Sequence, residues 1–280
     1  MHRRRDPIPI AGRAVAVTGG ARGIGRAIAA ELVHRGARVT IGDVDVALAE
    51  RTASEIGARG AALDVTDRAA FAAFLAAAGP VDVLVNNAGV LHVGPFLDTP
   101  EDWIRRQVEI NLVAVIHGMQ LALPGMLARG RGHVVNIASS AAKIGVRNEA
   151  VYAATKHGVY GVSESVRYEL RGSGVELTCV MPGLVRTELA AGTLSAKGIT
   201  VVTPEAVAAA VAGAIERPRF ELFVPRSYGT LAKLTGALPP RGRGALLRAL
   251  GAERATSSAT RADREAYEER MRALTGTPRP

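Results

Sequence analysis

Between residues 13 and 224, short apolar runs alternate with longer, Ala-rich segments of helical periodicity. The apolar runs consist of Val, Ile, Leu and Ala without regular polar alternation, which is typical of parallel strands covered on both faces. They predict strands at 14–18, 38–42, 61–64, 81–86, 133–137, 175–181 and 221–224. The intervening segments predict helices at 25–35, 46–56, 68–77, 101–128, 151–171 and 204–215. This alternation predicts one α/β domain with a doubly wound parallel sheet.

The chain changes character after residue 225. A breaker-rich stretch at 238–244 is followed by a short helical pattern at 245–250 and a charged helix at 264–274. We therefore divide the chain into a basic N-terminal arm (1–10), a domain (11–225) and a basic C-terminal extension (226–280). We expect the extension to be a partly ordered appendage. The alternatives are that it covers the domain, reaches a neighbouring subunit or makes peripheral contact with an acidic membrane.

The net charge of +9 lies mainly in these ends. Residues 1–10 carry +2 and residues 226–280 carry +6, so the body between them is close to neutral. A neutral body with 4% aromatic residues disfavours a nucleic-acid surface. The single cysteine, Cys179, excludes an intramolecular disulfide and fits a reducing compartment. No apolar run approaches the ~20 residues of a membrane span, and no secretory signal is recognised, so we expect a cytoplasmic protein.

A glycine cluster follows the first predicted strand directly, in the stretch from Thr18 to Gly25. Glycine permits a tight turn, close approach of the backbone to a pyrophosphate, and close packing of a helix on a strand. The following helix offers free N–H groups and the positive end of its dipole to an anion. Gly19, Gly23 and Gly25 therefore predict a dinucleotide phosphate site, in a spacing that departs from the common G-x-G-x-x-G pattern.

Asp43 ends the second predicted strand. A carboxylate there can accept hydrogen bonds from the adenosine ribose and repels a 2′-phosphate, so we predict NAD as the cofactor, with NADP as the alternative. Arg22 is the opposing signal, because its cation could meet a 2′-phosphate; a solvated loop arginine explains it equally well. Asp64, which ends the third predicted strand, is interpreted as an adenine contact or as a capping or turn residue.

Tyr152 and Lys156 are four residues apart at the start of a strong helical pattern, so both side chains share one helix face. A free tyrosine has a pKa near ~10 and is a poor base at neutral pH. A nearby lysine cation stabilises the phenolate and lowers that pKa toward the working range of general acid–base catalysis. The pair predicts a proton-transfer site.

Polar residues after two other strands support this site. Ser139, with Ser140 as the neighbouring candidate, follows the strand at 133–137, where a hydroxyl can hold a substrate oxygen. Asn87 lies just after the fourth strand, where a structural role at the strand end is favoured beside the cofactor site. Asn111 lies in the middle of a predicted helix, which is locally unfavourable and indicates a water-bound relay or a kink.

Together these residues resemble the short-chain dehydrogenase/reductase family over roughly residues 10–225. The shared features are Thr18-Gly19-x-x-x-Gly23-x-Gly25, Asp64-Val65, Asn86-Asn87-Ala88-Gly89, Asn111, Ser139, Tyr152-x-x-x-Lys156 and Pro182-Gly183. The resemblance implies a Rossmann-like sheet of about seven parallel strands. It also implies that 11–225 is a dinucleotide-binding catalytic domain acting on CH–OH groups with NAD(P).

The resemblance implies a role for each residue. Tyr152 would be the acid/base, Ser139 would hold the substrate oxygen, and Asn111 would position a water of the proton relay. Lys156 would bind the nicotinamide ribose and tune the tyrosine. The implied cofactor-binding residues are Thr18, Gly19, Arg22, Gly23, Ile24, Gly25, Asp43, Asp64, Val65, Asn87, Ala88, Gly89, Tyr152, Lys156, Pro182, Gly183, Val185 and Thr187.

The family is commonly oligomeric, which implies a homodimer or homotetramer formed through the helices at 101–128 and 151–171. Its variable substrate loop corresponds to 189–201, which is rich in Ala, Gly, Thr and Leu and contains Lys197. This composition favours an apolar secondary alcohol, steroid- or lipid-like, as the substrate. Two alternatives stay open: a non-catalytic dinucleotide-binding regulator, and a membrane-surface-associated reductase that uses NADPH.

Overall fold

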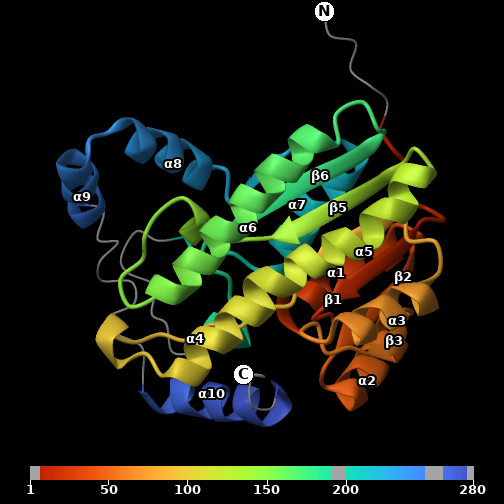
Figure 1. Ribbon diagram of the computed structural model, residues 1–280, viewed down its shortest axis with the longest axis horizontal. Coiled ribbons are helices and arrows are strands. Elements are labelled where there is room, and N and C mark those ends of the chain that lie inside the picture. Colours follow the sequence, from red (N-terminus) through yellow and green to blue (C-terminus); the bar gives the residue numbers. More distant parts are fainter. Residues whose placement is uncertain (1–6, 191–199, 250–260, 276–280) are drawn as a thin grey trace, which may run out of the picture.

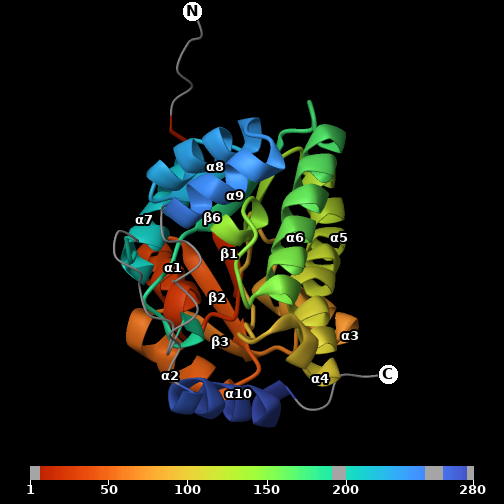
Figure 2. The ribbon, with the colours of Figure 1, turned by 90° about the vertical axis from the view of Figure 1, so that its left-hand side faces the viewer.

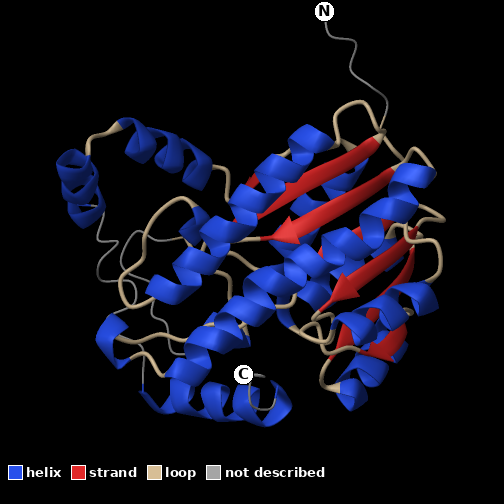
Figure 3. Ribbon diagram, in the orientation of Figure 1, coloured by secondary structure: helices blue, strands red, loops and turns tan. Residues whose placement is uncertain are grey.

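Parallel strands form the centre of the computed structural model, which describes residues 7–190, 200–249 and 261–275 (Figures 1 and 3). Within those residues the sheet has seven strands in the order β3-β2-β1-β4-β5-β6-β7. Their bounds are β1 Ala14–Thr18, β2 Arg38–Asp43, β3 Arg59–Ala62, β4 Val83–Asn86, β5 Gly132–Ile137, β6 Val175–Pro182 and β7 Glu221–Val224. The predicted doubly wound α/β sheet is therefore confirmed.

The central strands are buried on both faces, as their unbroken apolar composition predicts. Every residue of β1 and of β4 is buried. Val17 of β1 pairs in register with Ile41 of β2 on one side and with Val85 of β4 on the other. The strand order reverses between β1 and β4, so the loops that leave these two strands diverge and open a crevice at their carboxyl ends.

Helices cover both faces of the sheet (Figure 2). On one face lie α1 (Gly23–His34), α2 (Val46–Ile56) and α7 (Pro204–Glu216). On the other lie α3 (Arg68–Ala78), α4 (Glu101–Val108), α5 (Ala114–Ala128) and α6 (Ala150–Glu169). Each face has its own hydrophobic core: Ile28 and Val211 pack beneath the first layer, and Phe71, Trp103 and Met119 beneath the second.

Local signals account for most helix ends. Asp67 caps α3 by accepting hydrogen bonds from the N–H groups of Ala69 and Ala70. Thr203 caps α7, with proline at the first helical position as predicted. Gly57 ends α2 in the left-handed conformation.

Two strands, β3 and β4, have bounds that differ by two residues from those predicted. β3 begins at Arg59 and ends at Ala62, because these residues pair in register with Thr40 to Asp43 of β2. The predicted strand at 61–64 was therefore two residues late, and Asp64 lies in the turn that follows β3. β4 begins at Val83, two residues later than predicted, where its pairing with β1 begins.

The long segment at 101–128 is helical throughout but not regular. Residues Glu109–Val113 form a π-helical turn between α4 and α5, which accounts for the mid-helix Asn111 that was predicted to mark a kink or a relay. An 18-residue window of this helix has a mean hydropathy of 1.5, enough by length and composition to cross a membrane. The expectation that no apolar segment approaches that length is thus corrected. Here the helix packs on the sheet, with Val115 and Met119 buried.

The C-terminal extension is more helical than predicted. Helix α8 (Ser227–Ala237) was not predicted, and α9 (Pro240–Ala249) begins five residues early, because proline is compatible with the first turn of a helix. Helix α10 (Arg261–Thr275) contains the predicted charged helix. Figures 1 and 2 place α8 and α9 at one end of the molecule and α10 at the opposite end, below α4. α10 lies against the domain, which differs from the appendage expected.

Candidate active site

A cavity of about 920 Å³ lies beyond the carboxyl ends of the strands, at the crevice between β1 and β4. Residues from the turn after β1, the loops after β2, β4, β5 and β6, and helices α6, α8 and α10 line it. Of the residues singled out from sequence, the lining includes Gly19, Arg22, Gly23, Ile24, Asp43, Asp64, Val65, Asn87, Ala88, Gly89, Ser139, Ser140, Tyr152, Lys156, Pro182, Gly183, Val185 and Thr187. Thr18, Gly25 and Asn111 lie behind this lining.

The glycine turn after β1 is fixed by its neighbour from β4. The Thr18 hydroxyl oxygen accepts hydrogen bonds from the N–H groups of Asn87 (3.0 Å) and Ala88 (3.1 Å). The Asn87 amide donates in return to the carbonyls of Thr18 (3.0 Å) and Gly19 (2.9 Å). A Cβ added at Gly25 would run into the Gly19 carbonyl oxygen and approach the Asn87 Nδ2 atom to 2.6 Å. Thr18 and Gly25 thus shape the turn, and the predicted structural role of Asn87 is confirmed.

Asp43 lies where β2 meets the cavity. Its carboxylate accepts hydrogen bonds from the N–H groups of Ala21 and Asp45, both at 3.2 Å. Burial raises the pKa of Asp43, while the two hydrogen bonds and the Arg22 cation oppose that rise.

Arg22 is neither a solvated arginine nor a free cation in the turn. Its guanidinium forms ion pairs with Asp45 (2.6 Å) and Glu188 (3.3 Å). Both carboxylates compete with any phosphate for this cation. The ion pairs thus argue against a solvated loop arginine and weaken the signal that opposed NAD, while a contact of Arg22 with the cofactor stays a prediction.

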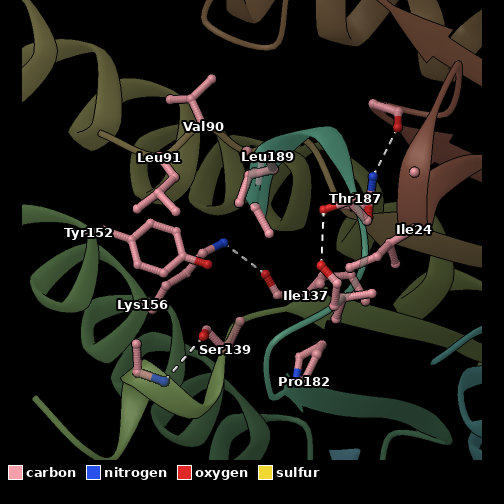
Figure 4. A pocket seen from close by; sticks show the side chains of 18 of the residues that line it. Ile24, Val90, Leu91, Ile137, Ser139, Tyr152, Lys156, Pro182, Thr187 and Leu189 are labelled. Atoms are coloured by element: carbon pink, nitrogen blue, oxygen red, sulfur yellow. Dashed lines mark hydrogen bonds between the residues drawn. The ribbon is translucent and has the colours of Figure 1, made fainter. Parts of the chain in front are cut away.

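Tyr152, Lys156 and Ser139 meet on one side of the cavity, with Ile24 and Thr187 on the other (Figure 4). Tyr152 and Lys156 are 8% and 4% exposed and share the first turns of α6. The Ser139 side chain lies near enough to the Tyr152 phenol to lower its pKa. The Ser139 hydroxyl oxygen accepts from the Ala141 N–H (3.1 Å), which orients it. Both Ser139 and Ser140 line the cavity, and of the two Ser139 is the one that affects the pKa of Tyr152.

The predicted lowering of the tyrosine pKa by Lys156 is wrong for this structure. Burial raises the pKa of Tyr152 well above its ordinary value, and the nearby Glu149 raises it further, while the Ser139 side chain only partly opposes them. The Lys156 Nζ donates to the Ile137 carbonyl (3.0 Å) and lies 5.6 Å from the tyrosine ring centroid. Burial also lowers the pKa of Lys156 to about 8. Desolvation is thus the largest influence on the pKa of both groups.

Glu149 is a cavity residue that sequence reasoning missed. It lies three residues before Tyr152, at the N-terminal end of α6, and it lines the cavity. Burial raises the pKa of Glu149 to about 7, against the opposing effect of the Arg264 cation. Its proximity in sequence to Tyr152 is the one signal that could have identified it.

Asn111 supports the cavity from behind. Its side-chain amide donates to the Val90 carbonyl and accepts from the Val90 N–H, both at 2.8 Å, and donates to the Thr155 hydroxyl at 3.3 Å. The side chain therefore pins the loop after β4 to α6. Its role in a water relay stays a prediction.

The remaining predicted residues follow the ends of β3 and β6. Asp64 accepts hydrogen bonds from the Thr66 N–H (2.9 Å) and hydroxyl (2.7 Å), which favours the turn role over a free adenine contact. Pro182 is the last residue of β6, and the Thr187 hydroxyl faces the Val185 carbonyl at 3.5 Å. Most of the predicted substrate loop, including Lys197, lies outside the described residues.

Comparisons with known proteins agree with this geometry. Residues 13–198 match the family model described as short chain dehydrogenase. The chain is 40% identical over 178 residues to the 2-keto-3-deoxy-L-fuconate dehydrogenase of Xanthomonas campestris pv. campestris, a match that covers 63% of this chain but only 59% of that relative. It is 38% identical over 227 residues to the 1-deoxy-11-beta-hydroxypentalenate dehydrogenase of Streptomyces exfoliatus, covering 75% and 82% of the two chains. A solved short chain dehydrogenase/reductase of Burkholderia phymatum, in complex with NAD, matches with a TM-score of 0.76 at 24% identity, covering 82% of this chain and 94% of that chain.

Proposed function

The chain belongs to the short-chain dehydrogenase/reductase family, and we propose that it transfers a hydride between NAD and an alcohol/ketone pair in this cavity. The observation that carries the proposal is that Ser139 converges with the buried Tyr152 and Lys156 on one side of a single cavity (Figure 4). Two hydroxyls that converge in this way can hold a single substrate oxygen between them.

The residues around the cavity fit NAD. Glycine at position 19 lets the turn lie directly against the loop after β4, since a Cβ there would lie 2.8 Å from the Ala88 Cα, and the turn lines the cavity where a pyrophosphate can bind. The Asp43 carboxylate lies at the end of β2, where a ribose hydroxyl can donate to it, and it disfavours a 2′-phosphate. NADP stays the alternative cofactor. When bound, NAD supplies the hydride acceptor for the alcohol carbon, and NADH the donor for the ketone.

Tyr152 moves the proton of the reaction. Its raised pKa keeps the phenol protonated at neutral pH, which is the form that donates to a ketone oxygen. Ser139 donates a second hydrogen bond to that oxygen and holds it against the phenol. Lys156 orients the site through its bond to the Ile137 carbonyl and adds positive charge beside the developing phenolate. Alcohol oxidation needs the phenolate, so it requires higher pH than ketone reduction.

The substrate we propose is an apolar secondary alcohol or its ketone, steroid- or lipid-like. Leu91 and Leu189 pack with Tyr152 in a small apolar cluster at the cavity. Apolar walls of this kind favour hydrocarbon over sugar. The streptomycete relative, named for a hydroxylated pentalenate, supports the same choice.

The test of this function is a panel of alcohols and ketones assayed for absorbance change with NAD, NADP and their reduced forms. Steroid, alicyclic, acyl-chain and sugar alcohols should be included. We expect turnover with apolar secondary alcohols and little with sugar alcohols. A preparation that binds NAD but turns over no alcohol or ketone in the panel contradicts the proposal and favours a non-catalytic regulator.

Replacing Glu149 with glutamine is expected to lower the pH at which alcohol oxidation becomes fast. The ionised carboxylate raises the pKa of Tyr152, so removing its charge makes the phenolate easier to form. We expect the rising limb of kcat/KM against pH to move down by about half to one unit. Below about pH 7 the native Glu149 is itself protonated, so the two profiles should converge there.

Glu164→Gln is the matched control for this experiment. Glu164 lies on the same helix but contacts the Tyr160 hydroxyl (3.0 Å) rather than the cavity. Its substitution should leave the profile unchanged. A shift to higher pH in Glu149→Gln, or an equal shift in both variants, contradicts the assigned role of Glu149.

Three further properties complete the proposal. We propose a cytoplasmic enzyme that forms a homodimer or homotetramer through α4–α5 and α6. The division into arm, catalytic domain and extension at residues 10 and 225 is retained. Peripheral membrane contact is assigned to α8, where Lys233 and Leu234 are both exposed.

A further inference from the structure

Helix α10 lies beyond the residues that match the family model, yet it forms part of the cavity. Four of its side chains line that cavity: Tyr267, Arg270, Met271 and Leu274. They face the apolar residues Leu91 and Leu189, which also line it. This side of the site is therefore built by a segment that lies outside the residues matched by the family model.

Two buried polar groups attach α10 to the loops at the cavity. The Arg264 guanidinium donates to the carbonyl of Leu189 (2.9 Å) and to that of Leu91, and its side chain is 6% exposed. The Tyr267 hydroxyl accepts a hydrogen bond from the Leu91 N–H (3.3 Å), and the residue is 5% exposed. Both terminal nitrogens of the buried Arg264 guanidinium thus bond to backbone carbonyls of the two loops, and these contacts favour one position for the helix.

Ion pairs at the rim extend this attachment to separate elements. Glu268 contacts His92 in the loop after β4 (2.9 Å), and Arg270 contacts Glu188 beside the substrate loop (2.7 Å). Arg272 contacts Asp102 of α4 (3.1 Å). The Arg270 and Arg272 pairs are exposed and contribute little energy each, whereas the Glu268–His92 contact is mostly shielded from solvent. Because their partners lie on three elements, the three contacts together fix the orientation of α10.

The apolar face of α10 points to the part of a substrate that is remote from the reacting oxygen. Met271 packs against the core beneath the second helical layer and, with Leu274, lines the cavity. Tyr267 lies closer to the proton-transfer site, near enough to affect the pKa of Tyr152. A substrate oxygen held by Tyr152 and Ser139 therefore leaves its hydrocarbon part directed along Leu91 and Leu189 toward this helix.

We propose that α10 is a substrate-binding wall whose residues Met271 and Leu274 bind the hydrocarbon chain or distal ring of an extended secondary alcohol. The proposal rests on the proposed function for the position of the reacting oxygen. It assigns to the C-terminal extension a binding role, and it accounts for the burial of Arg264 and Tyr267 outside the catalytic region.

The experiment compares a series of 2-alkanols from 2-butanol to 2-decanol in the native chain and in Met271→Ala/Leu274→Ala. In the native chain, kcat/KM should rise up to about fourfold per methylene once the chain reaches the wall. In the double variant, kcat/KM for 2-octanol should fall about tenfold while that for 2-butanol stays within about twofold. Leu274→Phe should act in the opposite sense, by narrowing the site and shifting the preference toward shorter alcohols.

Glu269→Ala is the matched control, since Glu269 is an exposed residue on the same helix. It should leave the whole series unchanged. The single tryptophan, Trp103, reports whether α10 stays docked, because the Arg272 guanidinium carbon lies 5.8 Å from its ring centroid. If Trp103 emission is unchanged in the double variant, α10 is still docked, and the loss of kcat/KM is due to the removed side chains alone. If the emission of Trp103 shifts in the double variant, Leu274→Phe becomes the decisive variant, because it keeps the apolar face of α10.

Calorimetric titration with 2-octanol and 2-butanol separates this proposal from the proposed function. Weaker binding of 2-octanol alone in the double variant supports the wall even if no alcohol is oxidised, and in that case only the proposed function fails. The role of α10 is overturned if kcat/KM depends on alcohol chain length in the same way in the native chain and in the double variant. It is also overturned if Leu274→Phe leaves that dependence unchanged.

Discussion

Replacing Tyr152 with phenylalanine is expected to lower kcat about a thousandfold while the dissociation constant for NADH stays within about twofold. The change removes one oxygen atom and keeps the buried ring, which packs with Leu91 and Ala153. Because the phenol is the group that exchanges a proton with the substrate oxygen, its loss affects the chemical step rather than the fold. Turnover should be measured in both directions, and cofactor binding by fluorescence titration.

Tyr160→Phe is the matched control for that experiment. Tyr160 lies two turns further along α6, and its hydroxyl contacts Glu164 and Glu221, both at 3.0 Å. Its removal should cost about 1 kcal/mol of stability and leave kcat unchanged. An active Tyr152→Phe enzyme, or equal losses in the two variants, would contradict the role given to Tyr152.

Replacing Asp43 is expected to change which cofactor the enzyme prefers. We expect the native chain to favour NAD over NADP by about a hundredfold in kcat/KM, because a carboxylate beside a 2′-phosphate is strongly unfavourable. In Asp43→Ala that preference should fall at least about tenfold, through weaker binding of NAD and easier entry of NADP. The ratio is measured with one alcohol and both cofactors.

Asp43→Asn separates charge from structure in this experiment. Asp43 also holds the glycine turn through the N–H groups of Ala21 and Asp45, and asparagine keeps an oxygen that can accept one of those bonds. If Asp43→Asn prefers NAD over NADP less strongly than the native chain does, the difference is therefore due to the lost negative charge. If the native chain prefers NADP, or if neither variant alters the ratio, the assignment of Asp43 as the ribose-binding carboxylate is wrong.

The sheet was predictable because its strands are buried on both faces. Val15, Val17 and their neighbours in β1 form an apolar run that is typical of a strand buried on both faces of a parallel sheet. The ends of β3 were not predictable, since its register is set by pairing with β2 and its residues are Arg, Gly and Ala. Periodicity identifies a strand, whereas long-range pairing decides where it stops.

The reacting group was identified from spacing, but its electrostatics were not. Tyr152 and Lys156 share a helix face as the four-residue interval predicts. The direction of the tyrosine pKa depends on the balance of burial against charge, and burial is a property of the whole fold. Spacing likewise left Ser139 and Ser140 equivalent, and the effect of Ser139 on the pKa of Tyr152 distinguishes them.

The substrate side of the cavity was the least predictable part. Tyr267 and Met271 follow Tyr152 by more than a hundred residues and belong to no shared motif. Their helix showed only a charged pattern in the sequence, and its contacts with Leu91 and Leu189 arise from the tertiary fold. For this reason the extension was interpreted as an appendage, whereas α10 docks on the cavity.

The central claim is that the Tyr152 hydroxyl faces the reacting carbon of the nicotinamide, with Ser139 beside it. A crystal structure of the chain with NAD and a slowly reacting alcohol tests this directly. We predict that the alcohol oxygen lies within hydrogen-bond distance of both hydroxyls, with its carbon against the nicotinamide ring. A tyrosine hydroxyl turned away from the ring, or a nicotinamide bound outside this cavity, would contradict the account.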